Sequence, residues 1–132
     1  MMGKSLKKLG DGELDVMLAV WDAWEDEKPV TSGDVMERLS GKRSWAITTL
    51  MTVLARLVEK GYLSCDRSTR TNLYSPLVAE RDYKERESRS FLSRMYRGSL
   101  PGFVSSLYQS GAVSDDDLEE LRRFIESAGK ER

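Results

Sequence analysis

The 132-residue sequence predicts a mainly α protein with one small β-hairpin. Apolar residues recur with a helical period in the first part of the chain, two short alternating runs follow at 62–66 and 71–75, and helical patterns fill the remainder. The predicted order is helix, short strand, helix, helix and hairpin, which is the order of a winged helix-turn-helix. We therefore predict a DNA-binding domain over residues 10–77 and a helical dimerisation region over residues 80–128.

The first two helices are predicted from their caps and apolar spacing. Asp11 can cap the first helix, and residues 25–27 with Pro29 end it. The next two residues, 29–30, can form a short extended piece, after which Thr31 or Ser32 caps a helix of about residues 33–39. The predicted buried positions of these two helices are Leu14, Met17, Leu18, Trp21, Trp24, Val35, Met36 and Leu39.

The third helix is the predicted recognition helix. Ser44 can cap it, and Gly61 follows its end at Lys60. Its predicted core stripe comprises Ile47, Leu50, Leu54, Leu57 and Val58. The opposite stripe comprises Trp45, Thr48, Thr49, Thr52 and Arg56. Three threonines on a solvent face lower helix propensity without contributing to the core, so this face is unusual for a purely structural helix.

Composition excludes several classes of function. The chain has no histidine and a single cysteine, Cys65, so it lacks the commonest general base, the usual transition-metal ligands and any intrachain disulfide. We therefore expect no enzyme activity, no metal and no cofactor. No apolar run is long enough to span a bilayer and no signal peptide is recognisable, so we expect a cytoplasmic protein without membrane insertion of its own.

The charge distribution favours a nucleic-acid partner for the middle of the chain. The formal net charge is −1, but residues 29–77 carry seven Lys or Arg against four Asp or Glu. Threonine can contact phosphates, base edges and the thymine methyl, while basic residues beside the helix and in the hairpin tip can bind phosphates. For Trp45 two positions stay open, at the edge of the core or against the DNA backbone. The candidate DNA-binding residues are Lys42, Arg43, Ser44, Trp45, Thr48, Thr49, Thr52, Arg56, Arg67 and Arg70.

The last third of the chain predicts three helices. A charged helix covers about residues 80–96, a short apolar helix covers about 103–108, and a final helix begins at Ser114. Their apolar stripes are too small for a separate core, so a second copy of the chain is the expected partner. The candidate dimerisation residues are Phe91, Leu92, Met95, Tyr96, Phe103, Val104, Leu107, Leu118, Leu121, Phe124 and Ile125.

Several runs resemble the penicillinase repressor family, which includes methicillin-resistance and copper-homeostasis repressors. The most specific is residues 45–63, WAITTLMTVLARLVEKGYL, which resembles the family's recognition helix. Further similarities occur at 14–17 with Trp21 and at 74–77, and looser ones in the C-terminal part at 91–92 with Tyr96 and at 118–122. The resemblance covers about residues 9–127 and implies a homodimeric repressor bound to a palindromic double-stranded DNA operator.

The resemblance also implies a mode of induction. In the β-lactam-responsive branch, a membrane-bound sensor-transducer protease triggers cleavage in the dimerisation region, which maps here to residues 104–108. This chain has Ser105, Ser106 and Leu107 where cleaved members carry an Asn-Phe bond, and it lacks the paired Cys-x-Cys motifs of the copper branch. The alternative is a ligand-sensing winged-helix regulator without proteolytic induction, although hydrophobic residues at 39% leave little apolar volume for a pocket.

Overall fold

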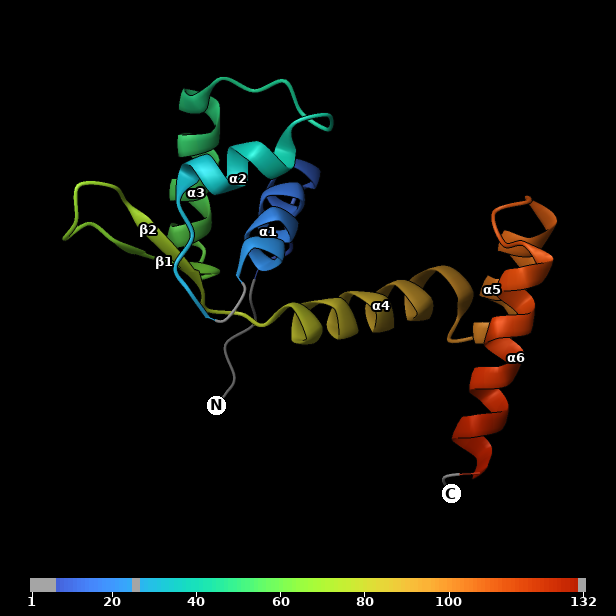
Figure 1. Cartoon of the computed structure of the whole chain (residues 1–132). Coiled ribbons are helices and arrows are strands. Elements are labelled where there is room, and N and C mark those ends of the chain that lie inside the picture. The colour runs from blue at the N-terminus through green and yellow to red at the C-terminus, as the bar shows by residue number, and fades with distance from the viewer. Residues whose placement is uncertain (1–6, 25–26, 131–132) are drawn as a thin grey trace. The chain divides into compact units, whose positions relative to one another are not determined.

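The computed structural model describes residues 7–24 and 27–130, which divide into two compact units with the boundary between Tyr83 and Lys84. We call the described residues up to Tyr83 the head and those from Lys84 the arm. Figure 1 shows the elements in chain order. They are α1 (Asp11–Ala23), α2 (Ser32–Leu39), α3 (Ile47–Glu59), β1 (Leu63–Asp66), β2 (Leu73–Pro76), α4 (Glu80–Tyr96), α5 (Leu100–Gln109) and α6 (Asp115–Lys130).

Three helices and an antiparallel hairpin form the head, as predicted. Strands β1 and β2 pair with Leu63 opposite Pro76 and Cys65 opposite Tyr74. Val30 adds a bridge to this hairpin, since its N–H donates to the Tyr74 carbonyl at 2.8 Å and its carbonyl accepts from the Tyr74 N–H at 2.7 Å. The expected extended piece at 29–30 is therefore present, and the winged helix-turn-helix fold class is confirmed.

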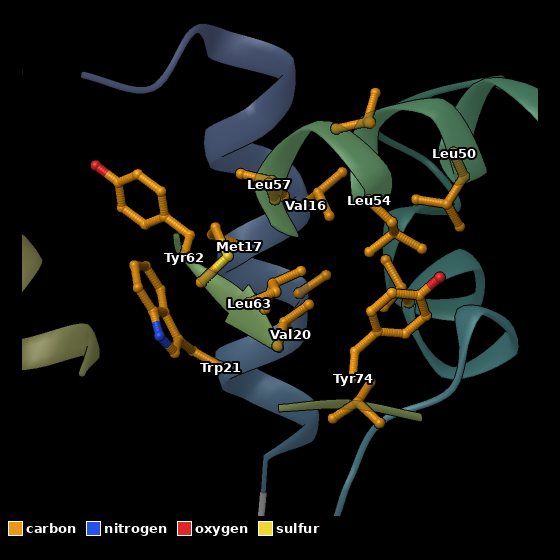
Figure 2. Close-up of a cluster of buried hydrophobic side chains, with 14 of the residues drawn as sticks. Val16, Met17, Val20, Trp21, Leu50, Leu54, Leu57, Tyr62, Leu63 and Tyr74 are labelled. Carbon is orange, nitrogen blue, oxygen red and sulfur yellow. The ribbon is translucent and has the colours of Figure 1, made fainter. Parts of the chain in front are cut away.

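The core of the head joins α1, α3 and the hairpin. Side chains from these elements meet in one cluster in Figure 2, and all of those labelled there are buried. The cluster's labelled members are Val16, Met17, Val20, Trp21, Leu50, Leu54, Leu57, Tyr62, Leu63 and Tyr74. Because this cluster holds α3 by one side only, the other side of that helix is left for solvent or a ligand.

Two predicted core stripes need correction. Ile47 is 48% exposed because α3 begins there, after an N-cap at Ala46, whereas Val53 is buried within the helix. Ser44 is therefore not the cap of this helix. In α1 the predicted stripe was partly wrong, because that helix is contacted by α2, α3 and β2 and buries a wider face. Its Leu14, Leu18 and Trp24 are half-buried, whereas Val16, Ala19 and Val20 are buried.

The helix caps resolve the remaining alternatives in the head. Thr31, rather than Ser32, caps α2: its hydroxyl accepts from the Asp34 N–H at 3.1 Å, and the Asp34 carboxylate accepts from the Thr31 N–H at 3.0 Å. Helix α1 begins with Asp11 as its first residue and Gly10 as its N-cap, so the expected cap at Asp11 was wrong. The Glu13 carboxylate accepts from the Gly10 N–H at 2.8 Å instead.

The head extends beyond the predicted range of 10–77. Leu9 and Tyr83 belong to its core. The Tyr83 ring lies with its centroid 5.8 Å from those of Trp21 and Tyr62, and the Trp21 indole N–H donates to the Val78 carbonyl at 3.0 Å. The first turn of α4 is therefore part of the head, because Tyr83 packs against Trp21 of α1 and against Tyr62, the residue that precedes β1.

The arm consists of the rest of α4 with α5 and α6. Helix α5 begins at Leu100, earlier than predicted, because Ser99 caps it by accepting from the Gly102 N–H at 3.0 Å. Helix α6 begins at Asp115, and Ser114 and Asp117 exchange hydrogen bonds of 3.0 Å at its start. Among the described residues of α5 and α6, none is buried. The side chains of α5 and α6 therefore cover one another only in part.

Candidate nucleic-acid interface

The outward face of α3 carries the predicted polar residues. Thr48, Thr49, Thr52 and Arg56 are all exposed, while Leu50, Leu54 and Leu57 on the other side are completely buried. The helical rotation inferred from the spacing is therefore observed for these residues. The Thr52 hydroxyl donates to the Thr48 carbonyl at 3.1 Å, so it keeps its acceptor lone pairs but already uses its proton within the helix.

The hairpin loop presents two further cations. Arg67 and Arg70 are exposed between β1 and β2, and neither forms an ion pair within residues 7–24 and 27–130. Asp66 orders the start of this loop, since it accepts from the Ser68 hydroxyl at 2.6 Å and from the Ser68 N–H at 2.9 Å. These hydrogen bonds lower the pKa of Asp66 below its ordinary value. The hairpin loop between β1 and β2, which we call the wing, therefore presents its two arginines from a locally ordered turn.

The segment between α2 and α3 holds four candidate residues in two different settings. Lys42 and Ser44 are exposed. Arg43 and Trp45 are half-buried, and the Arg43 guanidinium carbon lies 5.3 Å from the centre of the Trp45 ring. Trp45 packs against the core from a position before α3, so the prediction that it shares the helical stripe was wrong. Of its two open positions, the structure has Trp45 at the edge of the core.

A buried ion pair connects α1 with the end of α3, and sequence reasoning missed it. The Lys60 ammonium donates to the two carboxylate oxygens of Glu13 at 2.7 and 2.8 Å, and Glu13 is buried. Burial opposes ionisation, but hydrogen bonds from Lys60 and Gly10, with the charges of Lys60 and Arg56, outweigh it and lower the pKa of Glu13. The pair joins residues 47 positions apart, so no local spacing signal could have revealed it.

The arm presents exposed apolar side chains among its charged residues. Phe91, Tyr96 and Phe103 form an aromatic cluster with ring centroids 5.2–6.0 Å apart, and the Tyr96 hydroxyl lies 2.8 Å from that of Ser106. The candidate dimerisation residues that remain exposed are Phe91, Met95, Phe124 and Ile125. Those that are half-buried are Leu92, Tyr96, Phe103, Val104, Leu107, Leu118 and Leu121.

The candidate cleavage region lies inside a helix. Ser105, Ser106 and Leu107 fall in the middle of α5, and the Ser106 hydroxyl also donates to the Phe103 carbonyl at 2.9 Å. Ser105 is exposed, whereas Ser106 and Leu107 are half-buried. A protease that binds an extended peptide would therefore require this part of α5 to unwind first.

Two whole-molecule observations concern other kinds of site. In the part of the chain that the structure describes, no three His, Cys, Asp or Glu residues are grouped so that they could hold a metal ion. None of the described helices combines the length and the apolar character needed to cross a membrane. The features that do stand out are the polar face of α3, the basic residues on either side of it, and the exposed apolar side chains of the arm.

Comparison with known proteins finds relatives over nearly the whole chain. The sequence profile of the penicillinase repressor family matches residues 9–127. The penicillinase repressor of Bacillus licheniformis is 32% identical over 123 residues, covering 93% of each chain. The methicillin resistance regulatory protein MecI of Mammaliicoccus sciuri is 26% identical over 124 residues, covering 94% of this chain and 98% of that protein.

Two solved structures match part of this chain. The DNA-binding domain of the repressor BlaI is 31% identical, with a TM-score of 0.49, and covers 61% of this chain and 94% of that one. The monomeric form of Bacillus licheniformis BlaI in complex with the blaP half-operator is 30% identical, with a TM-score of 0.48, and covers 60% and 92%. On the evidence of the family profile and the full-length relatives, this chain belongs to the penicillinase repressor family of DNA-binding transcriptional repressors and is not an enzyme.

Proposed function

We propose that this repressor binds a palindromic double-stranded DNA operator as a homodimer, with the outward face of α3 in the major groove. The observation that carries the proposal is the division of α3 into a buried leucine side and an exposed side with Thr48, Thr49 and Thr52. A threonine hydroxyl can bond a base edge or phosphate, and its methyl can contact the thymine methyl. Exposed threonines otherwise weaken a helix, so a binding role accounts for their presence.

The basic residues around α3 supply contacts that position the head. Arg67 and Arg70 in the wing, Lys42 before α3, and Arg56 toward its end are all exposed. Such residues bind phosphates and add affinity that depends on salt but carries no direct sequence information. Removing one side chain that binds a phosphate should reduce the slope of log affinity against log salt by about 0.9.

The arm supports the dimeric part of the proposal. Phe124 is 67% exposed, Ile125 59% and Met95 64%, and the described residues of α5 and α6 include no buried one. A second copy would cover these side chains and would be held by the hydrophobic effect. Two linked heads then gain avidity on a palindrome that a single head lacks.

Release from the operator completes the proposed cycle in the cytoplasm. A membrane-bound sensor-transducer would lead to cleavage in α5 near Ser105, Ser106 and Leu107, separating the heads from the pairing surface. The helical hydrogen bonds and the Tyr96–Ser106 contact make local unwinding a precondition for that cut. Incubation with a broad-specificity protease tests this point: α5 should be cut only slowly in the dimer, and rapid cleavage there in the intact dimer would contradict the requirement for unwinding.

The DNA-binding surface is tested with the full-length chain and an operator selected from a random DNA library. Thr49→Ala should reduce operator affinity by about 1–3 kcal/mol and leave affinity for random DNA nearly unchanged. Arg70→Ala is the matched control, because it should weaken both kinds of DNA by similar factors. Failure of the wild-type chain to select any sequence would contradict the function, and equal loss on both DNAs for Thr49→Ala would contradict the role of α3.

A further inference from the structure

Arg43 is held in place on two sides, unlike the other cations near α3. Its Nε donates to the Asp15 carboxylate of α1 at 2.8 Å, and its guanidinium lies over the Trp45 ring. The two partners of the ion pair are each largely screened from solvent, with side chains 31% and 26% exposed. Lys42, its neighbour, is exposed and makes no ion pair within the described ranges. The chain thus orders one cation immediately before the helix proposed to bind DNA.

Gly12 allows this arrangement. A Cβ atom built at Gly12 would lie 3.1 Å from the Trp45 ring, which is closer than an ordinary van der Waals contact. Trp45 therefore lies against the backbone of α1, one turn from Asp15 along the same helix. The Trp45 indole and the Asp15 carboxylate therefore both contact the Arg43 guanidinium. All the residues of this arrangement come from α1 and the segment 43–45.

The ion pair leaves most of the donor groups of Arg43 available. An arginine side chain has five N–H donors, and the described structure assigns only the Nε donor, to Asp15. The two terminal nitrogens, Nη1 and Nη2, have no acceptor within residues 7–24 and 27–130. A guanidinium fixed in this way can donate two parallel hydrogen bonds to a phosphate, a geometry that arginine favours.

We propose that Asp15 and Trp45 are positioning residues that hold the Arg43 guanidinium ready for a DNA phosphate beside the N-terminus of α3. The proposal rests on the DNA-binding function proposed above and specifies how one of its phosphate contacts is built. Ordering the side chain when the protein folds reduces the conformational entropy that DNA binding would otherwise have to remove. Asp15 then aids DNA binding although it carries the same sign of charge as DNA.

Because Asp15 and DNA are both negatively charged, electrostatic repulsion and a positioning role predict opposite effects for removing this carboxylate. Simple electrostatics predicts that removing a carboxylate near DNA strengthens binding, because one repulsive charge is removed. A positioning role predicts the reverse for Asp15→Asn. The matched control is Asp22→Asn, which removes another α1 carboxylate that accepts from an arginine Nε at 2.8 Å, in this case Arg38 of α2.

The experiment measures binding of the full-length chain to the selected operator and to random DNA across a salt series. Asp15→Asn should weaken both by about two- to fivefold, in line with a partly exposed ion pair, whereas Asp22→Asn should leave binding unchanged or strengthen it. In an Arg43→Ala background, Asp15→Asn should no longer weaken binding. Stronger or unchanged binding by Asp15→Asn, or an equal loss with Arg43 absent, would overturn the proposal.

A second measurement does not depend on the stability of the variant. In the free wild-type protein, the Arg43 Nε–H should give a well-dispersed NMR resonance with slowed solvent exchange, and operator DNA should shift it. A resonance at the position of a solvated arginine in the free protein would overturn the proposal even if Asp15→Asn fails to fold. Absence of sequence-selective binding by the wild type would instead count against the DNA-binding function itself.

Discussion

The head and the arm differ in how much of their apolar surface is buried within one chain. In the described chain every fully buried apolar residue lies at or before Tyr83, whereas α5 and α6 have none. The head closes its core with three helices and a hairpin, while the arm leaves Phe124 and Ile125 more than half exposed. The head therefore completes its core within one chain, whereas the arm leaves an apolar surface that a second copy could cover.

The sequences of the two regions explain this difference. Helices α1 and α3 are rich in valine, leucine and methionine, and each packs against several other elements of the head. Most of α4 consists of charged residues and serines, so beyond Tyr83 it offers few side chains for a core. Helix α6 has a single apolar stripe, which needs a facing surface to be covered. The arm of a single copy therefore has too few apolar side chains to form a core of its own.

The largest expected effect comes from opening the closed core of the head. Leu54→Ala should lower the free energy of unfolding by about 2–5 kcal/mol, because it removes a fully buried side chain and leaves a cavity. Phe124→Ala is the matched change in the arm, where the side chain is 67% exposed. It should leave the unfolding of the head within about 0.5 kcal/mol of wild type. Denaturant titration of both variants at one concentration checks this contrast.

Equal destabilisation of the head by the two variants would contradict this difference between head and arm. If Phe124→Ala lowered the stability of the head as much as Leu54→Ala, the arm would be part of the same cooperative core. Phe124→Ala should instead act on assembly and weaken the dimer by about 2 kcal/mol, because it truncates an exposed aromatic side chain of the proposed pairing surface. A concentration series followed by sedimentation separates the two effects.

An intermediate effect is expected at the Glu13–Lys60 pair. Glu13→Gln should lower the free energy of unfolding by about 1.5–3 kcal/mol at neutral pH, because hydrogen bonds to a charged group are removed and Lys60 keeps its charge. The lowered pKa of Glu13 means that its ionised form stabilises the head. This contribution is complete above the ordinary glutamate pKa and is lost as the pH falls through the lowered value.

The pH series gives this prediction its control. The stability difference between wild type and Glu13→Gln should shrink as the pH is lowered below about 4. Urea titrations at several pH values measure it. A difference that stays constant down to the acid transition would show that the ionised carboxylate contributes nothing specific to the head.

The smallest expected effect on stability is at the DNA-facing side of α3. Thr49→Ala should leave the melting temperature of the free protein within a few degrees, because the side chain is exposed and alanine is the better helix former. Calorimetry on the free chain measures this, with Leu54→Ala on the opposite side of the same helix as control. Unfolding of Thr49→Ala at a much lower temperature would mean that this side of α3 is packed.

Local pattern sufficed for the elements but not for their contacts. The bounds of α4 agree with the charged run at 80–96, and the threonine side of α3 follows from helical spacing alone. Ile47 was wrongly predicted to be buried. Its spacing from Leu50 and Leu54 fits the core stripe, but it is the first residue of α3 and lies beyond the packed part of the helix. Periodicity describes a continuous helix and says little about where the helix begins.

Long-range contacts account for the rest of what the sequence did not predict. Glu13 forms an ion pair with Lys60, and Asp15 forms one with Arg43. The Tyr83 ring packs against that of Trp21, which lies more than fifty residues earlier in the chain. Each residue type is ordinary in its local setting, an acid in the first turns of a helix or an aromatic in a charged helix. Only the packing of α1 against the following elements brings the partners together.

Sedimentation equilibrium shows whether a head that folds by itself is joined to an arm that pairs with a second copy. At micromolar concentration the full chain should have twice the 15.0 kDa mass of one copy. A chain ending at Ser88, which retains Tyr83 and the first turns of α4, should sediment as a folded monomer. A full-length monomer under these conditions, or a shortened chain that still dimerises, would contradict pairing through the arm.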